Sequence, residues 1–183
     1  MDYGKNINDY TPEYIKNLNN YTDNFLCSTK DNLYNIRFIQ FTVRDLDSNY
    51  TLFEVFEEEN FDEDLENTEY PMKYHLGPDF LDFNNIGTIT KFSVGNQPVR
   101  NLLVIERHYF RKKLVKSFEF KFDFCIPNSI NNWETIYNIP ELDNDIKQDM
   151  INNPWETKSD SFYFVENKLI MHHKAEYNYS SLD

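Results

Sequence analysis

Glycine is scarce in this chain of 183 residues, which contains only four glycines. The chain has no P-loop and no GxGxxG, the motifs in which glycine lets the backbone approach a phosphate group. It also lacks the GxSxG motif of serine hydrolases and the HExxH motif of zinc proteases. We therefore expect no catalytic residues, no cofactor and no enzymatic activity.

Cysteine is rarer still, with two residues. Cys27 and Cys125 are far apart in the sequence, and neither belongs to a CxxC pair. Histidines do not cluster either, because the adjacent pair His172 and His173 would face opposite sides of a strand. Zinc sites need several such ligands at set spacings, so we expect no metal site and no disulfide. Both cysteines are interpreted as small apolar residues of the core.

Long apolar segments are missing as well. The longest run, residues 102–105, is far shorter than the roughly 18 residues of a membrane-spanning helix. No charged and then apolar leader of the secretory type is present at the start of the sequence. We expect a cytoplasmic protein without stable membrane insertion.

Basic residues are outnumbered, with 18 Lys and Arg against 31 Asp and Glu and a formal net charge of −13. Binding to nucleic acid relies on Lys and Arg, so this balance argues against a nucleic-acid partner. Many of the acidic residues lie within residues 54–69. Such a run is typical of a solvated loop, and the alternative is an acidic collar that attracts a basic peptide.

Aromatic residues, by contrast, are abundant, since 16 Phe, 13 Tyr and two Trp make up 17% of the chain. Ordinary cores are built mainly from Leu, Ile and Val, so this share indicates a wide apolar interior. The length and the absence of an internal linker indicate one domain. We expect a flexible N-terminal extension over residues 1–10 and a single β-sandwich domain over residues 11–183.

Most of the chain alternates with the period of two that is typical of β-strands. The clearest case is residues 117–124, where charged residues alternate with phenylalanines that share one face: Phe118, Phe120, Phe122 and Phe124. A strand region that starts at residue 33 changes its apolar face near Phe38. It therefore either contains a bulge at that point or is buried on both sides.

Two pairs of strands are predicted to form hairpins. Residues 88–94 and 99–110 are joined by a Gly-Asn pair, and residues 161–179 contain two alternating segments joined by a Glu-Asn pair. Many short antiparallel strands with few helices indicate an all-β sandwich.

Two short helices are expected outside the strands. Thr11, Pro12 and Glu13 form a helix-start pattern, with a capping hydroxyl, a proline at the first position and an acid in the first turn. A peripheral helix is predicted near residues 141–152, because its apolar residues recur at every fourth position: Leu142, Ile146 and Met150.

One strand carries charged residues on its apolar face. Leu102 and Val104 share a face with Glu106 and His108, so an inward orientation of the first pair would turn a carboxylate and an imidazole inward too. Burial of an unpartnered carboxylate is unfavourable by several kcal/mol. Glu106 therefore belongs to an internal salt bridge, to a solvent-facing strand, or to a polar gate beside an apolar cavity.

Two segments resemble a known family. Residues 106–127 (ERHYFRKKLVKSFEFKFDFCIP) and 159–179 (SDSFYFVENKLIMHHKAEYNY) closely resemble motifs of the uncoordinated-119 family of lipid-binding chaperones. Weaker similarity runs through DNLYNIRF, RDLDSNYTLFEV and TITKFSVGNQPV, and it extends over nearly all of the chain after the first helix-start pattern.

The resemblance implies a fold and a function. The family is related to the GMP phosphodiesterase delta subunit, a prenyl-binding carrier, and the implied fold is an immunoglobulin-like β-sandwich with a lipid cavity between its sheets. The implied function is that of a soluble carrier for N-myristoylated proteins, which a GTP-bound Arf-like small GTPase releases. Residues 127–133 (PNSINNW) look more like the delta subunit, so a prenyl-binding carrier is the alternative.

The resemblance also implies the site. The implied lipid-binding residues are Phe41, Tyr74, Phe80, Phe118, Phe120 and Tyr163. Glu106 and His108 would lie beside the peptide end of the lipid, with Tyr163 as a further hydroxyl. The resemblance further leads us to expect a monomer in the cytoplasm, enriched at the base of a cilium or flagellum. A protein-interaction sandwich whose aromatics only fill the core is the alternative from a different class.

Overall fold

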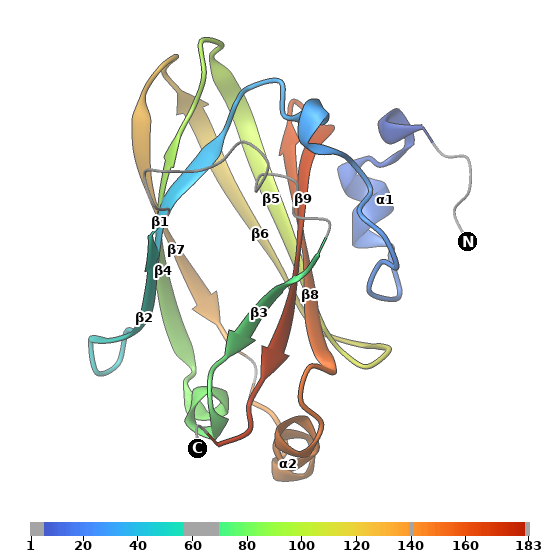
Figure 1. The fold of residues 1–183 in the computed structure, drawn as a ribbon, viewed down its shortest axis with the longest axis vertical. Helices are drawn as coiled ribbons and strands as arrows, with labels where there is room; N and C mark the ends of the chain where they lie inside the picture. Colours follow the sequence, from blue (N-terminus) through green and yellow to red (C-terminus); the bar gives the residue numbers. More distant parts are fainter. Residues whose placement is uncertain (1–5, 57–69, 140, 182–183) are drawn as a thin grey trace.

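The computed structural model describes residues 6–56, 70–139 and 141–181, and its strands form two sheets that face each other (Figure 1). The four-stranded sheet has the order β2 (Tyr50–Phe56), β1 (Arg37–Asp45), β4 (Asn85–Ser93) and β7 (Ile130–Asn138). The five-stranded sheet has the order β3 (Met72–His75), β9 (Lys168–Asn178), β8 (Thr157–Val165), β5 (Val99–Phe110) and β6 (Lys113–Cys125). The predicted all-β sandwich is confirmed.

Both predicted helices are present. α1 (Pro12–Lys16) begins where the Thr11 hydroxyl accepts a hydrogen bond from the Tyr14 backbone N–H at 3.2 Å, and α2 (Asn144–Asn152) packs at one end of the sandwich. Three 3₁₀ helices complete the described helical elements: η1 (Ile7–Asp9), η2 (Thr29–Asp31) and η4 (Pro78–Asp82). No helix in the described ranges is long and apolar enough to cross a membrane.

One predicted hairpin is wrong. β4 pairs with β1 and β7, whereas β5 pairs with β6 and β8, so residues 94–98 cross from one sheet to the other. The turn contains Gly95, at which an added Cβ would lie 2.9 Å from the Cβ of Asn35. A local turn pattern marks the reversal of the chain, but long-range pairing decides which sheet the next strand joins.

The second predicted hairpin is confirmed. β8 and β9 pair antiparallel, and the turn residues Glu166 and Asn167 have φ values of 50° and 67°. Positive φ at both central residues is the type I′ geometry that matches the twist of a two-residue hairpin.

The first strand differs from its prediction at its start. β1 begins at Arg37, since the chain turns over residues 33–36, where the Asn32 side chain binds the backbone of Ile36. Of the two alternatives for this strand, the structure has the bulge, because the pairing of β1 with β4 shifts register between Phe38 and Gln40.

Part of the acidic run lies in β2, where Glu54 accepts hydrogen bonds from Gln40 and Thr42 of β1 at 2.8 and 2.7 Å. Residues 57–69 lie outside the described residues, so neither a solvated loop nor an acidic collar is tested there.

The apolar core consists of two clusters. The inner core cluster closes one end of the space between the sheets with Ile36, Phe92, Val94, Val99, Leu102, Cys125, Val165, Ile170 and Met171. The outer core cluster lies on the far side of the five-stranded sheet, where the N-terminal segment covers it (Figure 1), and contains Tyr10, Ile15, Ile105, Phe162, Phe164 and Leu169. Both thiols are free, and burial raises the pKa of Cys125 to about 11.

The described part of the N-terminal segment, residues 6–10, packs on the sandwich. Ile7–Asp9 forms η1, and Tyr10 is buried in the outer core cluster. The outer face of the five-stranded sheet is apolar, so it requires such a cover.

A buried ionic cluster, formed by Thr22, Asp160, His172 and Lys174, fixes this segment to the sheet. The Asp160 carboxylate accepts from the Thr22 backbone N–H at 2.8 Å and from Lys174 Nζ at 2.8 Å. His172 Nδ1 accepts from the Leu26 backbone N–H at 3.0 Å. Asp160 is fully buried, so these partners compensate for its loss of hydration.

Candidate functional site

A cavity of about 500 Å³ lies between the two sheets, next to the inner core cluster. This volume is within the range of about 300–1,000 Å³ that small-molecule sites occupy. Most of its lining residues are apolar or aromatic, and they come from both sheets, η4 and α2. The structure therefore encloses a predominantly apolar space and not a filled core.

All of the site residues expected from the sequence line this one cavity: Phe41, Tyr74, Phe80, Glu106, His108, Phe118, Phe120 and Tyr163. They come from β1, β3, β5, β6, β8 and η4, which the chain brings together from positions far apart in sequence. Two of the four phenylalanines expected on one face of β6 do not line it, since Phe122 packs against the inner core cluster and Phe124 is 44% exposed under Arg100.

Aromatic rings form two parts of the wall. On one side, Phe53 lies between Phe41 and Tyr74, with ring centroids 6.2 and 5.8 Å apart. On the other side, the Tyr137 ring meets the rings of Phe118 and Phe120 edge-on, each at 4.8 Å. These ring contacts form two broad and rigid aromatic surfaces that face the cavity.

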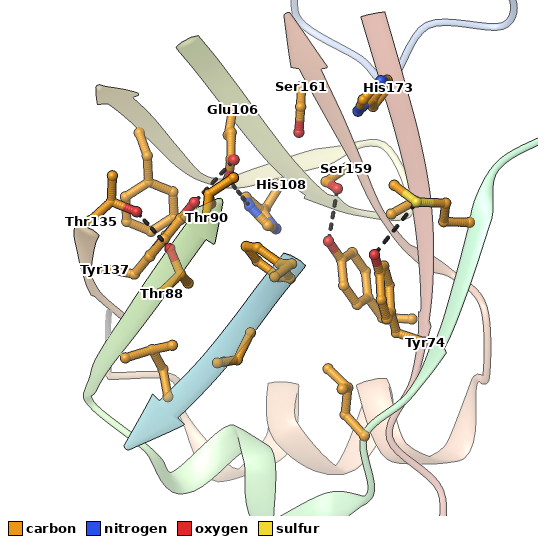
Figure 2. A pocket seen from close by; sticks show the side chains of 18 of the residues that line it. Tyr74, Thr88, Thr90, Glu106, His108, Thr135, Tyr137, Ser159, Ser161 and His173 are labelled. Atoms are coloured by element: carbon orange, nitrogen blue, oxygen red, sulfur yellow. Dashed lines mark hydrogen bonds and ion pairs between the residues drawn. The ribbon is translucent and has the colours of Figure 1, made fainter. Parts of the chain in front are cut away.

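Glu106 points into the cavity, and two side chains contact its carboxylate (Figure 2). The Tyr137 hydroxyl donates a hydrogen bond to Glu106 at 3.0 Å, and His108 Nε2 lies 3.5 Å from the other carboxylate oxygen. The Glu106 side chain is only 17% exposed. The strand therefore does not face solvent at Glu106. The carboxylate has partners within the protein, and it also lies beside the apolar cavity.

Tyr137 is the partner of Glu106 that sequence reasoning missed. It lies on β7, whose alternating residues Trp133, Thr135 and Tyr137 all line the cavity. Burial and the nearby Glu106 charge raise the pKa of Tyr137 well above its usual range. The same two causes raise the pKa of Tyr163, although the hydroxyl that donates to Glu106 is that of Tyr137. The alternation of β7 is the signal that could have identified it.

Two further pairs of polar side chains in the wall bind each other. Ser159 and Tyr177 share a hydrogen bond of 2.9 Å, and Thr88 and Thr135 share one of 2.7 Å, as Figure 2 shows for the labelled residues. The rest of the wall is mostly apolar. Within the described ranges, no group of three His, Cys, Asp or Glu residues could hold a metal ion.

Exposed apolar side chains connect the cavity to the surface at the edges of the two sheets. Val55 and Phe56 on β2 and Met72 on β3 line the cavity and are 48%, 60% and 43% exposed. The rims of β2 and β3 therefore offer an apolar route into the space between the sheets.

Comparison with known proteins agrees with this geometry. The family model described as GMP-PDE, delta subunit matches residues 30–179. The chain is 46% identical over 179 residues to Protein unc-119 of Caenorhabditis elegans, which covers 95% of this chain and 81% of that protein. It is 45% identical over 180 residues to Protein unc-119 homolog B of Homo sapiens, with coverage of 92% and 71%.

A more distant relative is Protein unc-119 homolog of Drosophila melanogaster, at 40% identity over 191 residues, with coverage of 92% of this chain and 72% of that protein. Identity at this level over most of both chains, together with the match to the family model, establishes common membership. The chain belongs to the GMP-PDE delta subunit family and resembles its unc-119 members, and this is a family of lipid-binding carriers, not of enzymes.

Proposed function

We propose that this protein binds the N-terminal myristoyl group of partner proteins and carries these proteins between membranes. The observation that supports the proposal most directly is an aromatic cavity that contains one partnered carboxylate, Glu106. The aromatic wall suits an acyl chain, and the carboxylate suits the amide N–H groups that follow the chain. A cavity for a plain hydrocarbon would need no carboxylate.

Magnitudes explain why both features are needed. A myristoyl chain has about twelve methylenes, and their burial at about 0.8 kcal/mol each is worth roughly 10 kcal/mol before ordering costs. A membrane offers the same chain a comparable environment. The carrier therefore needs contacts with the first peptide residues in order to bind its cargo selectively. We assign these contacts to Glu106, His108 and Tyr163, and the chain itself to Phe41, Tyr74, Phe80, Phe118 and Phe120.

The direct test measures fluorescence polarisation with one peptide that bears a myristoyl group, a farnesyl group or no lipid. We expect tight binding of the myristoylated peptide, weaker binding of the farnesylated one and no binding without lipid. A preference for farnesyl would support the prenyl-binding alternative. Equal binding of all three peptides would support a protein-interaction sandwich.

The polar contacts are tested separately. A triple alanine variant at Glu106, His108 and Tyr163 should bind the myristoylated peptide more weakly than the native protein. The control is Glu119→Ala, because Glu119 lies on β6 next to the cavity strand and pairs outward with Lys16 at 2.9 Å. Unchanged affinity in the triple variant would remove the assigned role of these residues.

Release of the cargo requires a second binding event, and we propose that a GTP-bound Arf-like small GTPase provides it. A partner that binds the empty or reshaped sandwich better than the loaded one lowers cargo affinity by thermodynamic coupling. The test adds the GTPase, loaded with GTP or with GDP, to a preformed complex of the carrier with a fluorescent lipopeptide. Equal displacement by both forms would argue against this mechanism.

The remaining expectations complete the proposal. The carrier acts as a monomer without a cofactor, its only small ligand being the acyl chain, in the cytoplasm and near the base of a cilium or flagellum. Size-exclusion chromatography with light scattering tests whether the carrier is a monomer, and fluorescence microscopy of the tagged chain tests its location. A stable dimer, or a tag confined to another compartment, would contradict it.

A further inference from the structure

Three polar side chains form one row across the inner face of the five-stranded sheet. Glu106 on β5 pairs in register with Ser161 on β8, and Ser161 pairs in register with His173 on β9. All three line the cavity, and Figure 2 shows them along one wall. Directly opposed residues of antiparallel strands project to the same side about 5 Å apart, so the row spans about 10 Å.

Among the residues that the structure describes, hydrogen-bond partners are found at only one end of this row. Glu106 is contacted by Tyr137 and His108, as described above. The side chains of Ser161 and His173, by contrast, form no hydrogen bond with any other part of the chain that the structure describes. The His173 ring packs instead against Phe38 and Tyr163, with centroid distances of 5.5 and 5.1 Å.

The chemistry of His173 fits a peptide group. Burial and the neighbouring His172 lower the pKa of His173 to about 4, so the imidazole is neutral at physiological pH. A neutral imidazole carries one N–H donor and one nitrogen acceptor, and Ser161 adds a hydroxyl that can do either. A peptide backbone offers the complementary donor and acceptor. A polar group left unpaired in an apolar wall is unfavourable, which indicates that a ligand completes the row.

We propose that Ser161 and His173 bind the peptide backbone that follows the lipid, so that the peptide lies across β5, β8 and β9 from Glu106 to His173. This inference rests on the proposed function and extends it by a second polar contact region. An extended chain rises about 3.3 Å per residue, so a path of about 10 Å holds about three residues. Because the contacts are to backbone groups, they tolerate different cargo sequences.

The experiment compares two unlabelled ligands, N-myristoylglycine and a myristoylated pentapeptide, as competitors of a fluorescent lipopeptide. The pentapeptide should bind the native protein more tightly, because it alone reaches His173. In His173→Leu, its affinity should fall by about tenfold, the equivalent of one lost hydrogen bond in a buried site. The affinity for N-myristoylglycine should stay the same or rise, and this binding also shows that the variant is folded.

Two variants serve as controls. His173→Asn keeps a donor and an acceptor and should retain most of the pentapeptide affinity. Thr90→Val replaces a hydroxyl on the opposite sheet that also faces the cavity, and it should leave the affinity for both ligands unchanged.

Three outcomes would overturn the inference. His173→Leu could bind the pentapeptide as tightly as the native protein, which would show that His173 makes no hydrogen bond with the peptide backbone. It could lose affinity for both ligands equally, which would place His173 against the acyl chain. Thr90→Val could cause the larger loss, which would place the peptide on the four-stranded sheet. Failure of the native protein to bind either ligand would instead contradict the proposed function.

Discussion

At the scale of single residues, the site depends on how the polar side chain of Glu106 is accommodated beside aromatic rings. The hydrogen bond from Tyr137 and the contact with His108 replace part of the hydration that the carboxylate loses. A hydrogen bond to a charged group contributes more than one between neutral groups. The missed residue Tyr137 is therefore as important for the site as the residues expected from the sequence.

Replacement of Tyr137 tests this interpretation in the protein without ligand. Tyr137→Phe keeps the ring but removes the donor, so we expect the free energy of unfolding to fall by about 1.5–3 kcal/mol. Tyr163→Phe is the matched control, because it removes a cavity hydroxyl that does not donate to Glu106. Urea denaturation followed by circular dichroism measures both. Equal losses would show that the contact with Glu106 is not what stabilises the site.

At the scale of elements, the N-terminal segment belongs to the folded core. Ile15 of α1 is fully buried in the outer core cluster, which also contains Phe162 and Phe164 of β8. The short helix α1 is stable only because this packing supports it, since a five-residue helix is unstable by itself.

Truncation of Ile15 should therefore destabilise the whole protein. We expect Ile15→Ala to lower the free energy of unfolding by about 2–5 kcal/mol through lost burial and a cavity. Ile126→Ala, at a residue that is 64% exposed, should change it by less than about 0.5 kcal/mol. Urea unfolding at one pH compares the two. A small effect of Ile15→Ala would mean that the segment is attached only weakly.

β9 carries titratable groups on both faces, and these make stability depend on pH. Burial lowers the pKa of His172 and, to about 4, that of His173, and hydrogen bonds from His172 and Lys174 lower the pKa of Asp160 against the effect of burial. His172 accepts from Leu26 at Nδ1, so its Nε2–H donates to Asp160 in the neutral form.

Stability should fall as the pH falls, because the unfolded histidine binds a proton more readily than the folded one. An unfolded histidine binds a proton below a pH of about 6.5, whereas folded His173 resists until about pH 4, so stability falls as the pH drops through this window. Between pH 7.5 and pH 5, His173 alone should remove about 2 kcal/mol. Urea midpoints at both pH values measure the loss. His173→Asn should reduce this loss.

At the scale of the whole molecule, the net charge of −13 acts on any charged cargo. A strongly negative protein attracts basic peptides over about one Debye length, roughly 10 Å at 0.1 M salt. The apolar cavity is unaffected by this field, so charge contributes to the rate of association and the cavity to the residence time.

Salt should separate these two contributions. We expect a myristoylated peptide rich in Lys to associate more slowly as salt rises from about 0.05 to about 0.5 M, with little change in its dissociation rate. A myristoylated peptide without charge is the control and should show no such dependence. Stopped-flow fluorescence measures both rates. Salt-independent association of the basic peptide would argue against steering by the net charge.

Much of the fold could be predicted from patterns that are local. The cap at Thr11, the type I′ turn at Glu166-Asn167 and the bulge near Phe38 are each set by a few adjacent residues, and the structure has all of them. The link between β4 and β5 could not be predicted, because the same turn residues serve a hairpin or a crossing between sheets. Pairing with strands distant in the sequence decides whether β5 joins the sheet of β4 or the other sheet.

The amino-acid sequence determined the class of the protein: its alternation requires strands, its aromatic content requires a wide apolar interior, and its motifs resemble one family. The tertiary structure decided what Glu106 contacts and where the row through Ser161 to His173 lies, because these residues come from strands separated in sequence. Side-chain direction within one strand follows from local geometry. Contacts across two sheets depend on register and on which sheet each strand joins, and these are fixed only when the whole chain packs.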